Sequence, residues 1–307
     1  DAVLATSPVE HAAVREPIDA AAEAGVDVRW FDVDGAGRVR LDQVDAILNE
    51  AAETGRPVVV SVQWVNNETG VIQPIEQIGR AIIQAREQSE VRAWLHVDGT
   101  QAVGKVPVDV AAAGIDMMSF AAHKFHGPKG VGALWVRTGV RLRPQQLGGP
   151  QERQRRGGTE NVSSIIGFGA AAEAAEAFLR ESERIETLRA MRDRFEQRIV
   201  EAIPQADVHG RDVPRVWNTT NIGFPHLEAE AILVGLSEKG VCASAGAACS
   251  SGSLEPSPVL LAMGMDEAIA HGSVRLSISR DTKDDELDTA AARLIEVVGK
   301  LREVMPV

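Results

Sequence analysis

Apolar residues recur with two different periods along the chain, and their order predicts its fold class. Residues 57–65 and 93–98 are short apolar runs that each end in a polar cluster, which is typical of buried strands. Between them, residues 73–88 place apolar side chains at helical spacing. A strand, a helix and a second strand joined by short loops predict a parallel βαβ sheet. Ligands of such sheets bind beyond the carboxyl ends of the strands.

The second half of the chain predicts a separate, smaller lobe. Residues 161–203 are rich in alanine, glutamate and arginine at helical spacing and predict long helices that join two lobes. A strand at 219–224, a helix at 227–236 and a closing helix at 284–304 fit an α/β lobe. The sequence therefore predicts an α/β protein with a mostly parallel, helix-flanked sheet and a smaller C-terminal α/β unit.

Length and composition agree with two domains. A chain of 307 residues, 44% of them hydrophobic, can bury a core in each lobe. We expect the large domain to span 1–184 and the small one 185–307. No apolar run reaches the roughly 18 residues that span a bilayer, so we expect no membrane association. The net charge of −12 disfavours direct binding of nucleic acid, which relies on lysine and arginine at phosphates.

The two cysteines have different surroundings. They show no framework spacing and follow no secretory leader, which favours a reducing cytoplasm over a disulfide scaffold. Cys242 stands in an apolar run and is expected to be a buried small hydrophobe. Cys249 lies in Ala-Gly-Ala-Ala-Cys-Ser-Ser-Gly-Ser, a segment of small residues that is typical of a mobile loop. The histidines have no metal-ligand spacing, so no metal site is expected.

Lys124 follows an apolar strand and stands beside a glycine-rich turn. An amine is nucleophilic when burial and nearby positive charge favour its neutral form, and His123 and Lys129 are close enough in sequence to help. Lys124 is therefore a candidate for a Schiff base, although a surface lysine in a Gly-Pro turn has the same pattern. Polar residues that also fall at predicted strand ends are Asn67, Asp98, Gln101 and His123.

A carboxylate, two amides and a lysine at one sheet edge suit the chemistry of pyridoxal phosphate (PLP). This cofactor needs an imine and a partner for its pyridinium nitrogen. Asp98 would keep that nitrogen protonated and so stabilise a substrate carbanion. Gln101 or Asn67 would then hydrogen-bond the phenolic oxygen. A turn carboxylate or a helix N-cap is the alternative interpretation of Asp98.

Seven ordered stretches of the sequence resemble the cysteine desulfurases of the NifS and IscS kind, within the PLP-dependent class V aminotransferase family. The resemblance covers nearly the whole chain and implies the type I fold of PLP-dependent transferases. The stretches are 7–11, 66–70, 96–101, 123–130, 156–161, 245–257 and 274–277.

The resemblance implies a role for each residue that contacts the cofactor. Lys124 forms the Schiff base, His11 stacks on the pyridine ring, and Asp98 and Gln101 contact the ring nitrogen and the phenolic oxygen. Asn67 lies near the ring and the substrate.

Further roles implied by the resemblance concern the phosphate and the substrate. His123 contacts the phosphate, and Thr159 reaches the phosphate of a neighbouring subunit, so a homodimer with shared active sites is expected. Arg275 holds the substrate carboxylate, for which its planar fork is suited. A surface salt bridge is the alternative for Arg275.

The reaction implied by the resemblance is the desulfuration of L-cysteine. Lys124 removes the α-proton, and the Cys249 thiolate, helped by a base such as His11, attacks the substrate sulfur. Alanine leaves, and the persulfide sulfur passes to a protein acceptor. That acceptor is an iron–sulfur scaffold, a tRNA-thiolation relay or a DNA-phosphorothioation assembly, and the sequence does not choose among them.

The sequence departs from the family pattern at two places. The family's phosphate-binding serine, three residues before the lysine, is here Ala121, so a hydrogen bond worth roughly 1.5–3 kcal/mol is missing unless Ser119 or water compensates. The chain also opens on a stretch that resembles an interior strand, so we expect an N-terminal stretch with a phosphate-cradling loop to be absent. The alternatives are a selenocysteine lyase, another class V aminotransferase, and a noncatalytic scaffold relative.

Overall fold

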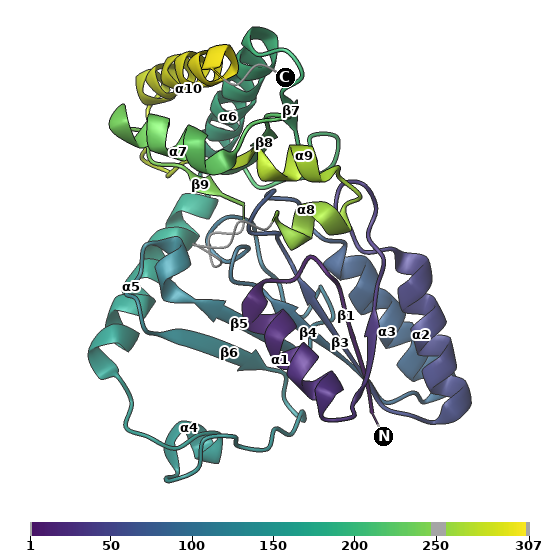
Figure 1. Ribbon diagram of the computed structural model, residues 1–307. Helices are drawn as coiled ribbons and strands as arrows, with labels where there is room; N and C mark the ends of the chain where they lie inside the picture. Colours follow the sequence, from purple (N-terminus) through teal and green to yellow (C-terminus); the bar gives the residue numbers. More distant parts are fainter. Residues whose placement is uncertain (1, 247–255, 305–307) are drawn as a thin grey trace.

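The computed structural model describes residues 2–246 and 256–304 and contains two β-sheets (Figure 1). The larger sheet has the strand order β2-β1-β3-β4-β5-β6. Neighbouring strands are parallel except β6, which pairs antiparallel with β5. The predicted mostly parallel sheet is confirmed. Its strands are β1 (Val3–Thr6), β2 (Asp27–Trp30), β3 (Val58–Gln63), β4 (Ala93–Asp98), β5 (Met117–Ala121) and β6 (Gly132–Val136).

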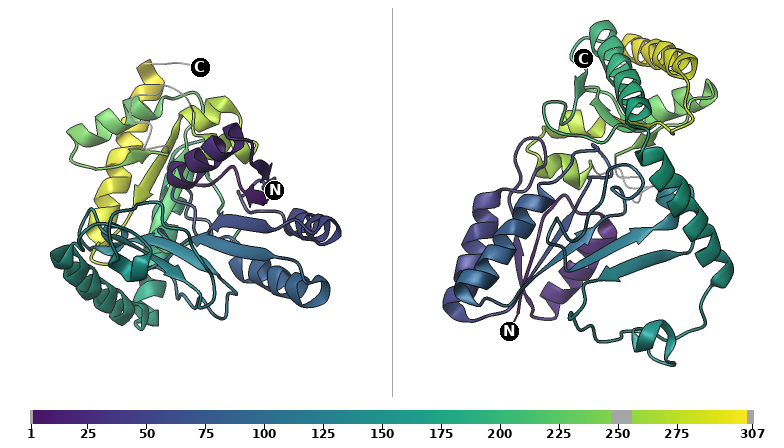
Figure 2. Two further views of the ribbon diagram at one scale, coloured as in Figure 1. Left: turned by 90° about the horizontal axis from the view of Figure 1, so that it is seen from below. Right: turned by 180° about the vertical axis from the view of Figure 1, so that it is seen from behind.

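The two faces of the larger sheet differ in chemistry, because side chains alternate along each strand. Val60, Val62, Leu95 and Val97 point to one face and form a core with Ile78 and Ile82 of a covering helix. The intervening residues of the same strands are largely polar, which leaves the other face for a site. The helices α2 and α3 lie side by side against the sheet, and α1 lies on its other side (Figure 2). Their bounds are α1 (Ala12–Glu23), α2 (Leu41–Thr54) and α3 (Ile75–Ser89).

The smaller sheet is antiparallel, with the order β7-β8-β10-β9. Helices α6, α7 and α10 pack on it and bury a second apolar core that includes Ile199, Ile222, Ile232 and Leu294. The helices predicted in this half are therefore present. The bounds are β7 (Asp207–Val208), β8 (Thr219–Gly223), β9 (Ser244–Ala245), β10 (Ser273–Ser277), α6 (Ser182–Ala202), α7 (Ala229–Glu238) and α10 (Asp284–Val304).

Shorter elements connect these units. A 3-10 turn, η1 (Ala122–Phe125), follows β5, and α4 (Gln151–Gln154) and α5 (Val162–Leu179) follow β6. Two short helices, α8 (Pro258–Ala262) and α9 (Glu267–His271), precede β10.

The turn after β3 joins the two sheets. Its Gly70 accepts a backbone hydrogen bond from Val216 (2.9 Å), and Ile72 donates one to Pro214 (2.9 Å). Gly70 has φ +76°, and a Cβ there would lie 3.1 Å from the Cβ of Thr219 in β8. Only glycine meets both conditions without strain. The carboxyl end of β3 is therefore held against the small sheet.

Helix α5 corrects the expectation that no segment is long and apolar enough to cross a membrane. Its 18 residues have that length and composition, which among the described residues is true of this helix alone. Its mean hydropathy is high because only Glu173 and Glu176 are charged. In the fold, the ring of Phe168 contacts those of Phe120 (5.7 Å between centroids) and Phe125 (5.6 Å). Its inner face thus packs against β5 and η1.

Replacing Gly79 of α3 by alanine should destabilise the protein. Alanine is the better helix former by roughly 0.8–1 kcal/mol, but a Cβ at Gly79 would overlap the carbonyl oxygen of Ala113 in the turn before β5. We expect a net loss of about 1–3 kcal/mol in the free energy of unfolding, measured by urea denaturation. Gly299 of α10 has nothing within 4 Å of its Cβ position, so Gly299→Ala should instead stabilise. A stabilising Gly79→Ala would contradict this packing.

Candidate active site

A cavity of about 500 Å³ opens where β3, β4 and β5 end, beside the start of α1 and Arg275 in the middle of β10. The predicted ligand position beyond the carboxyl ends of parallel strands therefore holds a real cavity. Of the nine predicted site residues, seven line it: His11, Asn67, Asp98, Gln101, His123, Lys124 and Arg275.

Lys124 and His123 stand on η1, directly after β5. His126 ends this turn in the left-handed conformation, with φ +69°. Both Lys124 and His123 are exposed at the cavity. The Lys124 side chain is therefore open to the cavity at the end of β5. Desolvation, then the charges of Lys124 and Lys129, lower the pKa of His123.

Asp98 ends β4 and is buried, and its Oδ1 accepts a hydrogen bond from the backbone N–H of Thr100 (2.9 Å). His96 lies on the same face of the strand, two residues earlier. Its Nδ1 is 2.8 Å from the Ser61 hydroxyl, and its Nε2 is 3.2 Å from that of Ser119. Burial lowers the pKa of His96. The polar face of the sheet is thus a chain of hydrogen bonds across three strands that leads up to Asp98.

Glu10 is a cavity residue that sequence reasoning missed. Its Oε1 accepts hydrogen bonds from the backbone N–H of Gln63 (2.7 Å) and from Ser7 (3.3 Å), and its Oε2 is buried with no partner among the described residues. Burial, reinforced by the Asp98 charge, raises the pKa of Glu10 to about 8. Glu10 is therefore a neutral acid at pH 7. Its position next to His11, after a buried strand, is the sequence signal that was available.

Lys105 is a second missed residue. It is buried, and its Nζ donates a hydrogen bond to Oε1 of Gln101. This bond leaves the Gln101 NH₂ group available as a donor. Burial, then the charges of Lys124 and Arg275, lower the pKa of Lys105 to about 7. These cations meet in an adjoining cavity of about 350 Å³, and the four-residue spacing of Gln101 and Lys105 was the signal in the sequence.

Arg275 reaches the same place from the smaller sheet. Its Nη1 donates to the backbone oxygen of Asn67 (3.0 Å) and its Nη2 to the hydroxyl of Ser244 on β9 (3.2 Å). Asn67 Oδ1 is buried and has no partner among the described residues. A substrate carboxylate at this point would meet a guanidinium that is already oriented.

Of the remaining two predicted residues, the structure describes only Thr159, which is not among the residues that line this cavity. Thr159 is exposed in the segment before α5. Cys249 lies outside the described residues.

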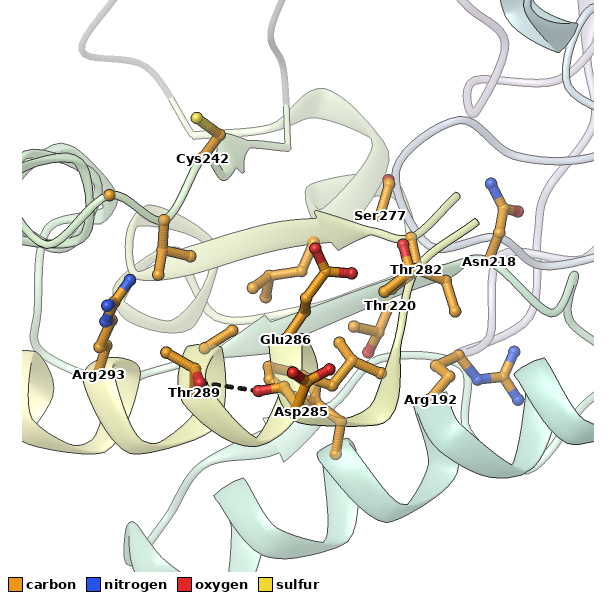
Figure 3. A pocket seen from close by; sticks show the side chains of 17 residues that line it. Arg192, Asn218, Thr220, Cys242, Ser277, Thr282, Asp285, Glu286, Thr289 and Arg293 are labelled. Carbon is orange, nitrogen blue, oxygen red and sulfur yellow. Dashed lines mark hydrogen bonds between the residues drawn. The ribbon is translucent and has the colours of Figure 1, made fainter. Parts of the chain in front are cut away.

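Cys242 corrects an expectation, because it is exposed rather than buried. It precedes the two-residue strand β9 and takes no part in its pairing with β10. Its side chain lies at the rim of a second cavity of about 590 Å³ between β10 and α10 (Figure 3).

The residues around the first cavity fit PLP. Lys124 offers an amine, Asp98 a buried carboxylate, and Asn67 an oxygen that lacks a partner. Lys105 and Arg275 supply positive charge for anionic groups. These are the groups that the cofactor and an amino-acid substrate require.

Comparison with known proteins decides the family. Residues 1–289 match the family model Aminotransferase class-V. The chain is 46% identical over 303 residues to cysteine desulfurase 2 of Trichormus variabilis, covering 99% of this chain and 73% of that protein. This chain belongs to the cysteine desulfurases of the class V aminotransferase family.

Solved structures of this family agree with the fold. A NifS-like protein from Rickettsia africae superposes with a TM-score of 0.85 at 27% identity, covering 97% of this chain and 76% of that one. A structure titled SspA in complex with cysteine has a TM-score of 0.72 at 31% identity, covering 91% and 74%. The predicted PLP-dependent fold and cofactor are confirmed, and the chain is a PLP-dependent desulfurase.

Glu10→Gln should remove a pH dependence of stability. The pKa of Glu10 rises from 4.5 to about 8 on folding, so its contribution to the free energy of unfolding is full below pH 4.5 and is lost as the pH approaches 8. Glutamine cannot ionise. In urea denaturation of the cofactor-free protein, the free energy of unfolding of the wild type should therefore fall relative to that of the variant as the pH rises from about 5 to about 9. The exposed Glu16→Gln is the control, and equal pH profiles for wild type and Glu10→Gln would refute the assignment.

Ala121→Ser should tighten PLP binding. Ala121 lines the cavity and has no donor for a phosphate, whereas the hydroxyl of Ser119 lies 3.2 Å from Nε2 of His96 on the face of the sheet. A new hydrogen bond to a charged group should lower the PLP dissociation constant about tenfold or more in an absorbance titration. Ser119→Ala should change it little. An unchanged constant in Ala121→Ser would show that another donor serves the phosphate.

Proposed function

We propose that this chain converts L-cysteine to L-alanine, keeps the sulfur as a persulfide on Cys249 and passes it to a protein acceptor. The observation that supports this most is the convergence of Lys124, Asp98 and Arg275 on one cavity in a member of the cysteine desulfurases. SspA, a structural neighbour, binds cysteine by its title. The acceptor is proposed only as a class, a scaffold or relay protein.

In this proposal each charged or polar residue of the cavity has one role in binding or in proton transfer. Arg275, oriented by Asn67 and Ser244, binds the α-carboxylate of L-cysteine through its planar fork. Lys124 carries the proton between its Nζ and the α-carbon. PLP, when bound, supplies an electron sink for the carbanion. Asp98 pairs with the pyridinium nitrogen, while neutral Glu10 adds no second negative charge.

Sulfur transfer requires a thiolate and no external oxidant. The Cys249 thiolate forms a bond to the substrate sulfur as the carbon–sulfur bond breaks, and the electron pair of that bond stays with the β-carbon, which takes up a proton. The carbon is reduced and the sulfur is oxidised to the persulfide level, so the step balances. His11 is the candidate base for deprotonating the Cys249 thiol. It lies in the cavity at the start of α1, where its Nδ1 accepts a hydrogen bond from the backbone N–H of Ala13 (3.1 Å).

The active unit is a homodimer in this proposal. Thr159 is exposed and outside its own cavity, as suits a residue that reaches the phosphate of a partner subunit. Close by, α5 exposes Val162 (62%) and Ile166 (68%). Apolar side chains gathered at such a surface favour a protein contact. We propose a reducing, cytoplasmic setting and a domain boundary at 184–185, within the first turn of α6.

Cys249 separates this function from the alternatives. A class V aminotransferase needs no thiol in such a segment, whereas persulfide formation depends on one. A selenocysteine lyase would share the cavity and differ in substrate preference. A noncatalytic scaffold would have no reason to keep Lys124, Asp98 and Arg275 together.

Cys249→Ser should abolish sulfur transfer and spare the cofactor chemistry. With L-cysteine, PLP and a reductant, the wild type should release alanine and sulfide, and the variant should release neither above background. The variant should still exchange the α-hydrogen of L-alanine in heavy water, because that step uses Lys124 and not the thiol. Cys242→Ser is the matched control and should behave as wild type. Undiminished sulfide release by Cys249→Ser would overturn the assignment.

A further inference from the structure

Glu68 is a buried carboxyl group at the wall of the cavity that the reaction described above does not use. It belongs to the turn after β3, which joins the two sheets. Its Oε2 accepts a hydrogen bond of 2.6 Å from the hydroxyl of Ser257, a residue 189 positions later in the chain. A Cβ at Gly246 would overlap the same oxygen, so Gly246 packs directly against the carboxyl group.

Gly246 and Ser257 bracket the segment that carries Cys249. One carboxyl group therefore contacts the chain on both sides of the catalytic thiol. A Cβ at Gly246 would also lie 3.5 Å from the Cβ of Ser257, so the two ends of the segment come together at Glu68.

Ser257 is itself held in place. It is the N-cap of α8, where its Oγ accepts the N–H of Leu260 (3.3 Å) while it donates to Glu68. Leu260 and Val259 of α8 pack on Val9, in the loop that leads to His11. The carboxyl group of Glu68 thus orients the hydroxyl of Ser257, and this hydroxyl caps the start of α8, the helix that packs against the wall of the active site.

The same turn also orients Arg275, which we call the substrate clamp because it would bind the substrate carboxylate. Asn67, next to Glu68, accepts from Arg275, and Ser244, two residues before Gly246, accepts from the other arm of Arg275. The charged groups that act on Glu68 are Arg275 and Arg15. Burial raises the pKa of Glu68, and the Ser257 hydrogen bond and those two cations oppose the rise. The group that would bind the substrate carboxylate and the two ends of the Cys249 segment therefore contact the same short turn after β3.

We propose that Glu68 is a positioning residue for sulfur transfer: through Ser257 and Gly246 it holds both ends of the Cys249 segment against the substrate clamp formed by Arg275. This inference rests on the proposed desulfurase function and adds to it. Glu68 acts as a hydrogen-bond acceptor and a packing partner, and it transfers no proton. Removing it should slow attack by the thiol more than it weakens substrate binding, because the hydrogen bonds of Arg275 to Asn67 and Ser244 do not involve Glu68.

The test compares two reactions of one enzyme. The first is formation of the Cys249 persulfide from L-cysteine in a single turnover, followed by mass. The second is exchange of the α-hydrogen of L-alanine in heavy water, which uses Lys124 and Arg275 and no thiol. Glu68→Ala removes a hydrogen bond to a buried carboxyl group, and Gly246→Ala places a Cβ that would overlap that group. Each should slow the first reaction about tenfold and leave the second within about twofold.

Glu68→Gln separates positioning from proton transfer. Glutamine keeps an acceptor oxygen for Ser257 and cannot act as a base, so it should restore persulfide formation to within about threefold of wild type. Glu76→Ala, at an exposed position on α3, is the matched control. An equal loss of both reactions in Glu68→Ala, or a Glu68→Gln variant as slow as Glu68→Ala, would overturn the proposal. If Glu68→Ala does not fold, Ser257→Ala removes the same hydrogen bond and takes its place.

A third readout is independent of turnover. Alkylation of Cys249 by iodoacetamide, relative to exposed Cys242 in the same molecule, should change at least severalfold in Glu68→Ala, and an unchanged ratio would contradict the proposal. If the wild type forms no persulfide yet exchanges the alanine hydrogen, the proposed function fails, and the alkylation ratio still decides the role of Glu68.

Discussion

The turn that follows β3 is the constraint on which the rest of the structure depends. It ends a strand of the large sheet and bonds to the backbone at Pro214 and Val216, so it fixes the two sheets relative to one another. Its Asn67 receives Arg275 from the smaller sheet. Because the substrate clamp comes from one sheet and the lysine from the other, the distance between them is set by this junction. A cavity with both groups exists only while the two sheets remain docked.

Burial then decides which groups carry charge inside that cavity. Glu10 and Asp98 are both buried carboxyl groups on its wall, and two adjacent negative charges without a cation would repel each other. Desolvation raises the pKa of Glu10 to about 8 and leaves it neutral. Lys105 is subject to the opposite effect, because burial and the neighbouring cations lower its pKa to about 7. The wall therefore presents the Asp98 carboxyl group toward the cofactor ring, and the side chains of Lys105, Lys124 and Arg275 toward the anionic groups of its ligands.

Hydrogen bonding across the sheet supports the same arrangement. The Ser61, His96 and Ser119 contacts satisfy a polar face that would otherwise be costly to bury, and they leave Asp98 at the open end. On the other side, Glu68 and Ser257 join segments that are far apart in sequence. The two networks bear on different steps, one on the cofactor ring and the other on delivery of the thiol.

The sequence by itself determined the local elements and the residues that stand at strand ends. The periods of its apolar residues predict β3, α3 and β4, and a parallel sheet brings Asp98 and Lys124 to one edge because all its strands end on the same side. Only the tertiary structure decided the burial of Glu10, the bond between Lys105 and Gln101, the exposure of Cys242 and the contact of Glu68 with Ser257. Periodicity reports which face of an element is apolar, whereas these features depend on how distant elements pack, and packing sets the dielectric and the partners that each side chain meets.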